Sequence, residues 1–385
     1  MIHYLDGNKL TLLQSGAQYF PALECSLEQA RSEIYLETYI FADDQTGRRI
    51  AAALCRASQR GLRVHVLVDG FGAQDMAAPL RQSMLDAGVA LLVYRRKISP
   101  LTLRRRRLRR MHRKIAVVDG CIAFVGGINV IDDMNTPGQV PPRYDYAVQI
   151  EGPLLAPIHH EVARLWRWVA LANLQRSQRL AGRANVDSSP KGIQRAALLV
   201  RDNFRHRADI EDAYLEAIGS AREEIIIANA YFLPGVRFRR ALRRAARRGV
   251  RVVLLLQGRV EYALLHYASR ALYGTLLDAG VEIHEYHESF LHTKVGVVDG
   301  RWATVGSSNI DPFSLTLARE ANIAVLDAVF ADELRMSLRK AMRSGTIQLA
   351  KASWRRQALW RKVVICLAYG FVRMLLGIVG YAEQD

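Results

Sequence analysis

The chain repeats itself once along its length. Three segments of the first half return in the second half in the same order: SEIYLETYIF (32–41) as EEIIIANAYF (223–232), RGLRVHVLVDG (60–70) as RGVRVVLLLQG (248–258), and LDAGVALLVY (85–94) as LDAGVEIHEY (277–286). A chain of 385 residues is long enough for two domains of ordinary size. The duplication therefore predicts two tandem homologous domains that share one fold.

Each half also shows the same alternation of apolar runs and helical stretches. The order reads helix, strand, helix, strand, helix and strand, followed by one more apolar run. Strands that alternate with helices are typical of βαβ units. Arg-rich stretches such as FRRALRRAARRG (238–249) fit exposed helix faces that end at a glycine cap. We therefore expect an α/β fold in which each half is a mainly parallel sheet flanked by helices.

A short motif, HxKxxxxD, opens the last apolar run of each half. The two copies, with the small-residue turns that follow after the same six-residue gap, are His112, Lys114, Asp119 and GGIN (Gly126–Asn129), then His292, Lys294, Asp299 and GSSN (Gly306–Asn309). A single His and Lys pair is common on basic surfaces, but two copies with Asp and Asn at matching offsets are not. The repeated spacing marks these residues as a candidate site.

The spacing has a physical consequence. Both runs, KIAVVDG and KVGVVDG, read as buried strands that close in Asp-Gly turns. Side chains two apart on a strand share a face and lie about 6.5–7 Å apart, so the His and Lys of each copy point the same way. Two such strands side by side would gather two imidazoles and two ammonium groups. Buried positive charge of this kind needs an anion, and phosphate is the expected one.

These residue types can act on a phosphate by themselves. One imidazole can serve as nucleophile and the other as general acid or base, while the lysines stabilise charge on the phosphoryl oxygens. No carboxylates cluster with the spacing of a metal site, and the four cysteines show no zinc-like spacing. We therefore expect neither a metal nor any other cofactor.

The motif pair resembles that of the phospholipase D superfamily, and the resemblance covers nearly the whole chain. It extends to an acidic residue downstream of each copy, Asp145 in RYDYAVQIEGP and Glu320 in LAREANIAV. It implies two tandem phospholipase D-like domains with the active site at their interface, where an acidic group is hydrogen-bonded to a catalytic histidine. The residues that it marks as catalytic are His112, Lys114, Asp119, His292, Lys294 and Asp299. Those that it marks as supporting are Gly126, Asn129, Asp145, Gly306, Ser307, Ser308, Asn309 and Glu320.

Four of these residues are expected to stabilise the structure of the motif and not to contact the substrate. Asp119 and Asp299 end their strands at Asp-Gly turns, so we expect them to organise the motif. Asn129 and Asn309 are expected to order the turn after each motif, with side-chain contacts near the lysines.

Within the superfamily, the chain is most similar to the bacterial cardiolipin synthases, particularly the B type. The segments that carry this likeness are YLETYIFADD, RRMHRKIAVVDG, DYAVQIEGP, IIIANAYFLPG and WATVGSSNIDPFSL. The likeness implies transfer of a phosphatidyl group from one phosphatidylglycerol to a hydroxyl of another, through a phosphatidyl-histidine and with release of glycerol. It implies His112 as the nucleophile, and it allows phosphatidylethanolamine as a second phosphatidyl donor. Two other functions stay open: a phospholipase D-type hydrolase of lipid or nucleic acid, and a non-catalytic basic membrane-binding protein.

The charge of the chain indicates an anionic partner. The formal net charge is +17, which suits an anionic membrane surface or nucleic acid. The segment 95–110 holds nine basic residues and contains the twelve residues by which the first half exceeds the second before its motif. We interpret it as a contact for anionic lipid, with a solvated loop as the alternative. Because no nucleic-acid-binding module is recognisable, no nucleic acid partner is expected.

Composition shifts divide the chain into four parts. We place the first phospholipase D-like domain at 1–170, a polar linker at 171–195, the second domain at 196–350 and a basic, apolar tail at 351–385. The tail contains twenty residues (363–382) with one charge, Arg373. That length is about a minimal membrane span, but the central arginine and the glycines favour a segment that lies in the membrane interface. A core-packing helix is the alternative.

The start of the chain lacks the basic and apolar pattern of a signal peptide. Together with the tail, this predicts a peripheral or monotopic protein on the cytoplasmic face of the inner membrane.

Overall fold

The computed structural model describes residues 2–74, 76–95, 109–173, 185–202 and 205–378. Most of the predicted basic segment (96–108) and part of the predicted linker (174–184) lie outside these residues. The predicted linker is too long at both ends, because residues 171–172 belong to helix α5 (Leu155–Ala172) and residues 194–195 belong to strand β9 (Gln194–Arg201). Between them, residues 185–193 contain no helix or strand.

The first half follows the predicted order, with one strand added at its start. Its elements are β1 (Leu5–Gln14), α1 (Ser15–Gln29), β2 (Glu33–Thr38), α2 (Gln45–Gln59), β3 (Arg63–Asp69), α3 (Ala78–Asp86), β4 (Ala90–Tyr94), β5 (Lys114–Val118), β6 (Ile122–Gly126), β7 (Arg143–Tyr144), β8 (Tyr146–Glu151) and α5 (Leu155–Ala172).

The second half repeats this order and continues into the tail. Its elements are β9 (Gln194–Arg201), α6 (Asp209–Ser220), β10 (Glu224–Asn229), α7 (Val236–Arg247), β11 (Arg251–Gln257), α8 (Ala263–Arg270), α9 (Tyr273–Asp278), β12 (Glu282–Tyr286), β13 (Phe290–Leu291), β14 (Lys294–Val298), β15 (Trp302–Gly306), α10 (Pro312–Thr316), β16 (Glu320–Leu326), α11 (Ala328–Gly345), β17 (Thr346–Gln348), α12 (Lys351–Arg355) and α13 (Leu359–Ile378). The predicted Arg-rich helix is α7, and Gly249 follows it with a positive φ of 91°.

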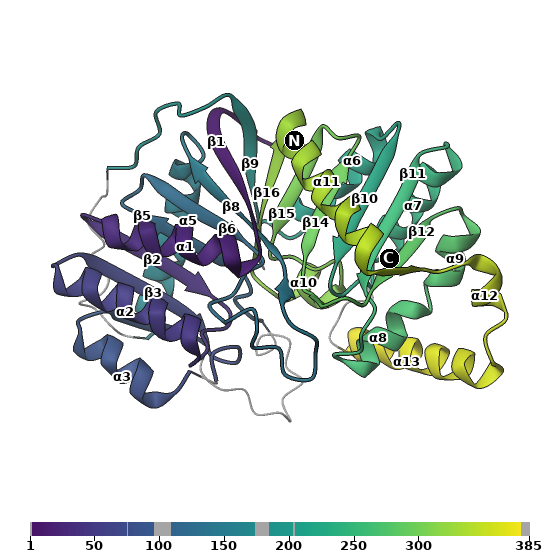
Figure 1. Ribbon diagram of the computed structural model, residues 1–385, viewed down its shortest axis with the longest axis horizontal. Helices are drawn as coiled ribbons and strands as arrows, with labels where there is room; N and C mark the ends of the chain where they lie inside the picture. The colour runs from purple at the N-terminus through teal and green to yellow at the C-terminus, as the bar shows by residue number, and fades with distance from the viewer. Residues whose placement is uncertain (1, 75, 96–108, 174–184, 203–204, 379–385) are drawn as a thin grey trace.

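Strands from both halves form one continuous sheet. Its order is β17-β12-β11-β10-β14-β15-β16-β9-β1-β8-β6-β5-β2-β3-β4. Figure 1 shows the two halves side by side, with β1, β9 and β16 between them. The α/β class is confirmed, and the halves are joined through antiparallel pairing of β1 with β9.

The structure corrects one part of the fold prediction, the mainly parallel sheet. Within the large sheet, the described strands pair in parallel at β2-β3-β4 in the first half and at β10-β11-β12 in the second, and the other pairs are antiparallel. The motif strand of each half is instead followed by an antiparallel partner, β6 after β5 and β15 after β14. Tight turns that open with Asp119 and Asp299, both at positive φ, make these connections. Because such a turn has no room for a crossover helix, the strands that it joins are antiparallel.

Helices cover both faces of the sheet. Helices α5 and α11 lie over one hydrophobic cluster that runs through both halves, with Trp166 on α5 and Phe330 on α11. The opposite face carries a separate cluster for each half, under α1 to α3 and under α6, α7 and α9. Because one cluster spans both halves, their relative position is fixed by buried apolar contacts.

The last described element of the tail is helix α13, which packs against α8 at one end of the molecule (Figure 1). Ile365 and Val372 are buried. The exposed apolar side chains of this helix are Leu359, Trp360, Val363, Val364, Leu367, Phe371 and Met374. The alternative of a core-packing helix therefore accounts for only a few of its apolar side chains. Among the residues that the structure describes, no helix is both long enough and apolar enough to span a membrane.

Candidate active site

The motif strands do not lie side by side, contrary to the expectation from their spacing, because six strands separate β5 from β14. The histidines approach each other because the segment ahead of each strand crosses to the opposite half. The His112 amide donates to the Arg319 carbonyl (2.9 Å), and the Arg319 amide donates to the Arg110 carbonyl (2.7 Å). In the same way, the His292 amide donates to the Tyr144 carbonyl (2.9 Å). Each histidine is therefore held by the other half.

The crossing places His112 beside the acidic residue of the second half. Its Nδ1 lies 3.0 and 3.1 Å from the two carboxylate oxygens of Glu320 and 3.1 Å from the Ser307 carbonyl. The Ser307 hydroxyl donates to Glu320 at 2.5 Å. Because all the groups around Nδ1 are acceptors, this nitrogen carries the proton and the lone pair is on Nε2.

His292 is held in the same manner by the first half. Its Nδ1 lies 2.7 Å from Oδ2 of Asp145, whose other oxygen accepts from the Tyr146 amide at 2.8 Å. Oδ2 also lies 3.7 Å from the Lys294 ammonium. A Cβ at Gly127 would overlap the Asp145 carboxylate, so the glycine is required for this arrangement.

The motif lysines are buried at the start of their strands. Lys114 and Lys294 are 3% and 0% exposed, which leaves their charge almost without water. Each ammonium donates to the carbonyl of the histidine two residues before it. The Lys114 ammonium also lies 5.4 Å from the Tyr39 ring centroid. Each lysine side chain therefore turns back toward the histidine of its own motif.

Burial and mutual repulsion lower the proton affinity of the cationic groups. Burial lowers the pKa of His112, and attraction to Glu320 opposes that shift. The pKa of His292 is lowered well below its ordinary value, first by burial and then by Lys294 and Arg143. Burial lowers the pKa of Lys114 to about 7. A bound phosphate would offset this repulsion, so the site is suited to an anion.

Asp119 and Asp299 lie away from these groups, at the far ends of the motif strands. Asp119 accepts from the backbone amides of residues 31–33, at 2.8 to 2.9 Å. Asp299 accepts from the amides of residues 222–224 at the same distances. Each carboxylate thus fixes the start of the neighbouring strand, β2 or β10, which agrees with the organising role expected from sequence.

The small-residue turns pack tightly behind the motifs. A Cβ at Gly126 would lie 2.5 Å from the Ala147 Cα, and a Cβ at Gly306 would overlap the Asn322 side chain. Asn129 accepts from the Ile40 amide at 3.0 Å, which orders the turn. Within the described residues, its side chain makes no hydrogen bond to a lysine, contrary to the expected contact near the lysines.

The second turn differs from the first in its asparagine. The Oδ1 of Asn309 is buried and has no hydrogen-bond partner within the described residues. The Ser308 hydroxyl donates to the Asn309 carbonyl, and the Ser308 amide donates to Asn322 (both 3.3 Å).

Other residues that sequence reasoning missed also influence the site. The Tyr39 ring lies 4.9 Å from that of His112, and the Arg143 guanidinium helps to lower the pKa of His292. Glu261 accepts a hydrogen bond from Tyr231, and its charge opposes the lowering of the pKa of Lys294 by burial. None of them belongs to the repeated motif, so only their position in the fold identifies them.

The described part of the chain shows no group of three or more His, Cys, Asp or Glu side chains arranged as metal ligands. The site as described consists of two histidines, two lysines and two carboxylates, with each histidine contacting the carboxylate of the opposite half.

Known proteins resemble this chain over most of its length. The family model described as "Cardiolipin synthase, PLD-like domain" matches residues 23–166 and 214–342. The chain is 39% identical over 377 residues to Cardiolipin synthase B of Escherichia coli (strain K12), covering 98% of this chain and 90% of that protein. It is 31% identical over 335 residues to Cardiolipin synthase A of Pseudomonas putida (strain GB-1), covering 87% of this chain and 68% of that protein.

A solved structure shares the fold at much lower identity. The phosphatidylserine synthase of Haemophilus influenzae Rd KW20 matches with a TM-score of 0.68 and 16% identity, covering 95% of this chain and 93% of that one.

Proposed function

This chain belongs to the family of cardiolipin synthases with phospholipase D-like domains, and on that premise we propose how its residues transfer a phosphatidyl group. As a member of that family, the chain is a phosphatidyltransferase that acts on phospholipids such as phosphatidylglycerol. The observation that carries the mechanism is the crossed pairing of His112 with Glu320 and of His292 with Asp145. In each pair the carboxylate occupies Nδ1, so that Nε2 of the histidine can react with substrate. Because the histidine and the carboxylate come from opposite halves, neither half contains a complete pair.

In the first step, Nε2 of His112 attacks the phosphorus of a first phosphatidylglycerol. The P–O bond to glycerol breaks, and His292 gives its proton to the departing oxygen. The covalent imidazole is cationic, and both oxygens of Glu320 face its Nδ1. Lys114 and Lys294 stabilise the phosphoryl oxygens. The phosphate charge raises the proton affinity of His292, which is otherwise lowered by its cationic neighbours.

In the second step, His292 is neutral and takes the proton from a hydroxyl of a second phosphatidylglycerol. The hydroxyl oxygen attacks phosphorus from the side that glycerol left, the P–N bond breaks, and His112 is regenerated. Two in-line displacements give overall retention at phosphorus. Because the bond made resembles the bond broken, glycerol should drive the reaction backwards.

The direct test is incubation of the pure protein with phosphatidylglycerol labelled in its headgroup and in its phosphate. We expect cardiolipin and free glycerol in equal amounts. Phosphatidic acid as the main product would instead indicate a phospholipase D-type hydrolase. Inversion at a chiral phosphorothioate substrate would exclude the double displacement.

The same assay tests the second donor and the need for a metal. Phosphatidylethanolamine labelled in its phosphatidyl group should also transfer its label to cardiolipin if it serves as a donor. Full activity should persist in excess EDTA, since lysines supply the charge that a metal would supply elsewhere. Loss of activity in EDTA with recovery on adding Mg²⁺ would contradict the metal-free scheme.

Attachment to a membrane surface is part of the proposal. Helix α13 presents apolar side chains such as Trp360, Leu367 and Phe371 to solvent, beside exposed residues of α8 such as Leu264 and Tyr267. An amphipathic surface of this kind binds in the interface, and basic residues add about 1 kcal/mol each near anionic lipid. The cytoplasmic face of the inner membrane is the expected location.

Deletion of 363–385 should release much of the protein from membranes at high salt. It should reduce activity on vesicles more than on detergent-dispersed lipid. Unchanged retention would mean that the tail is not the anchor.

A further inference from the structure

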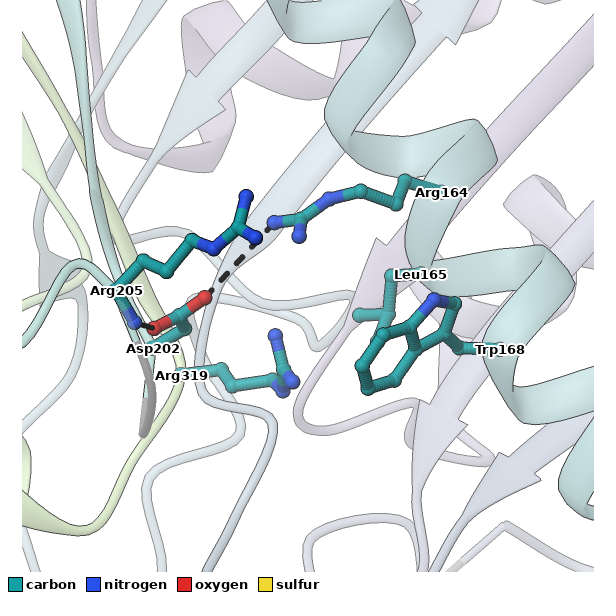
Figure 2. Close-up of a pocket in the computed structure, with 6 residues that line it drawn as sticks. All are labelled: Arg164, Leu165, Trp168, Asp202, Arg205 and Arg319. Carbon is teal, nitrogen blue, oxygen red and sulfur yellow. Dashed lines mark hydrogen bonds and ion pairs between the residues drawn. The ribbon is translucent and has the colours of Figure 1, made fainter.

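A second basic site lies between the two halves, apart from the catalytic histidines. It is a cavity of about 290 Å³ where helix α5 of the first half faces the loop after β9 and the start of β16. Its lining residues are Arg164, Leu165, Trp168, Asp202, Arg205 and Arg319. Figure 2 shows the three guanidinium groups pointing into the space between these elements. We propose that this cavity, here called the arginine pocket, binds the phosphate group of an anionic phospholipid.

Positive charge is in excess in the arginine pocket. Among the described lining residues Asp202 is the single carboxylate, and it lies 3.9 Å from Arg164. Arg164 also pairs with Glu161 at 2.8 Å, on the helix side of the pocket. Within the described part of the chain, no ion pair to a carboxylate involves Arg205 or Arg319. Two guanidiniums thus remain for an external anion, and guanidinium binds phosphate oxygens in a planar, two-pronged manner.

The pocket is built into the fold and is not a surface charge run. Arg319 is only 8% exposed, and its Nε donates to the Tyr94 hydroxyl at 3.3 Å. Asp202 is 4% exposed and accepts from the backbone amides of Arg205 and His206. These contacts hold the backbone of Arg205 and His206 beside Asp202, and burial restricts the Arg319 side chain. Preorganised donors of this kind reduce the entropy lost on binding.

The apolar wall of the pocket favours a lipid over a free phosphate. Leu165 and Trp168 lie beside the guanidiniums, and Trp168 is 55% exposed although it is aromatic (Figure 2). One turn further along α5, Leu171 is also 55% exposed. A tryptophan next to arginines matches the boundary between phosphate and acyl chain in a phospholipid. The volume suits a headgroup, and the acyl chains would lie along the exposed end of α5.

The pocket is connected to the catalytic site through one residue. The Arg319 backbone is hydrogen-bonded to Arg110 and His112, and the next residue, Glu320, orients the His112 ring. The Arg319 and Glu320 side chains point to different sides, one to the pocket and one to the histidine. A phosphate bound to Arg319 would therefore lie next to the residues that form the His112–Glu320 pair, but outside the catalytic site.

The test uses the full chain with His292→Ala, so that bound lipid is not turned over. The probe is dihexanoyl-phosphatidylglycerol below its critical micelle concentration. Binding is measured as the change in tryptophan fluorescence that is lost in the Trp168→Phe variant. Arg164→Gln and Arg205→Gln should each weaken binding about tenfold. The matched controls on the same elements, Arg167→Gln and Arg207→Gln, should change it by less than about twofold.

Three outcomes would overturn the assignment. The pocket variants could bind as tightly as the controls, inorganic phosphate could bind as tightly as the lipid, or dihexanoyl-phosphatidylcholine could bind as tightly as the anionic lipid. If Arg164→Gln fails to fold because Glu161 loses one of its two arginine partners, Arg205→Gln decides the result, since the Arg205 side chain is exposed. Equal binding by all variants, with cardiolipin still formed by the unmodified chain, would refute the pocket and leave the proposed transfer intact.

Discussion

Glu320 and Asp145 have the same task in the two halves of the site, but their surroundings differ. Glu320 presents two oxygens to His112 and is itself held by the Ser307 hydroxyl. Asp145 presents one oxygen to His292 and shares it with the Lys294 ammonium at 3.7 Å. In each half, the acidic residue, Asp145 or Glu320, therefore fits the turn that packs behind it.

The turns explain how each acidic residue fits. GSSN places Ser307 against the longer Glu320, whereas GGIN places Gly127 against the shorter Asp145, where a Cβ would overlap the carboxylate. The resulting histidines are electrostatically unlike. Attraction to Glu320 is the largest effect that opposes the lowered pKa of His112, whereas burial and neighbouring cations dominate at His292. His112 is thus better suited to carry positive charge in the proposed covalent intermediate, which supports the proposal that it is the nucleophile.

The largest expected effect is loss of either histidine. His112→Ala and His292→Ala should each lower kcat by about 10⁴-fold or more, because the two rings act as a unit. Melting temperatures should change little, since neither ring belongs to the main hydrophobic clusters. Cardiolipin formation from labelled phosphatidylglycerol measures the effect. Substantial turnover by either variant would refute a mechanism that needs both.

The acids should differ in their effects if the histidines have different roles. Glu320→Gln should lower kcat by about 10³-fold and Asp145→Asn by about 10²-fold, because only Glu320 stabilises the covalent imidazole. Rapid-quench measurement of the phosphatidyl-histidine gives a direct readout, with slower accumulation expected in Glu320→Gln. The opposite order of effects would exchange the roles of His112 and His292.

The lysines predict a pH dependence. The pKa of Lys114 is lowered to about 7 by burial, so this side chain is charged below that pH and neutral above it. Loss of the charge weakens binding of the substrate phosphate, so kcat/KM should fall about tenfold per pH unit above about pH 7. Lys114→Arg should remove this basic limb, even at reduced activity, because the guanidinium stays charged. A flat profile from about pH 6 to 9 would rule out this assignment.

The smallest expected effect is a loss in the free energy of unfolding when the Asp of either motif is replaced, and this loss should be equal in the two halves. Asp119→Asn and Asp299→Asn each turn one carboxylate oxygen into a donor that faces backbone amides, at a cost of about 1–3 kcal/mol. Asparagine tolerates the positive φ at both positions, so backbone strain does not contribute. Denaturant unfolding should show similar losses. If Asp299→Asn kept full stability but lost all activity, Asp299 would belong with the groups that contact substrate.

Much of the fold and of the site could be predicted from the duplicated pattern. The alternation of apolar runs and helical stretches identified strands β2, β3 and β4 and helix α7, and the motif identified His112 and His292. The antiparallel pairing of most strands in the sheet was missed, although the Asp-Gly turns after each motif strand are themselves a hairpin signal. Arg143 and Glu261 carry no repeated pattern, so no local signal could have placed them beside Lys294.

By itself, the sequence determined the chemistry of the site and its twofold occurrence. Residue type and spacing act over a few residues, and they put His and Lys on one side of a strand end in each half. Only the tertiary structure decided which acid serves which histidine. The segments ahead of the motif strands cross to Arg319 and Tyr144 of the opposite halves through backbone hydrogen bonds, and these join residues about 150 to 210 positions apart in the chain. The sequence carries no local signal for such a contact, because it depends on the burial of a shared hydrophobic cluster that brings the two halves together.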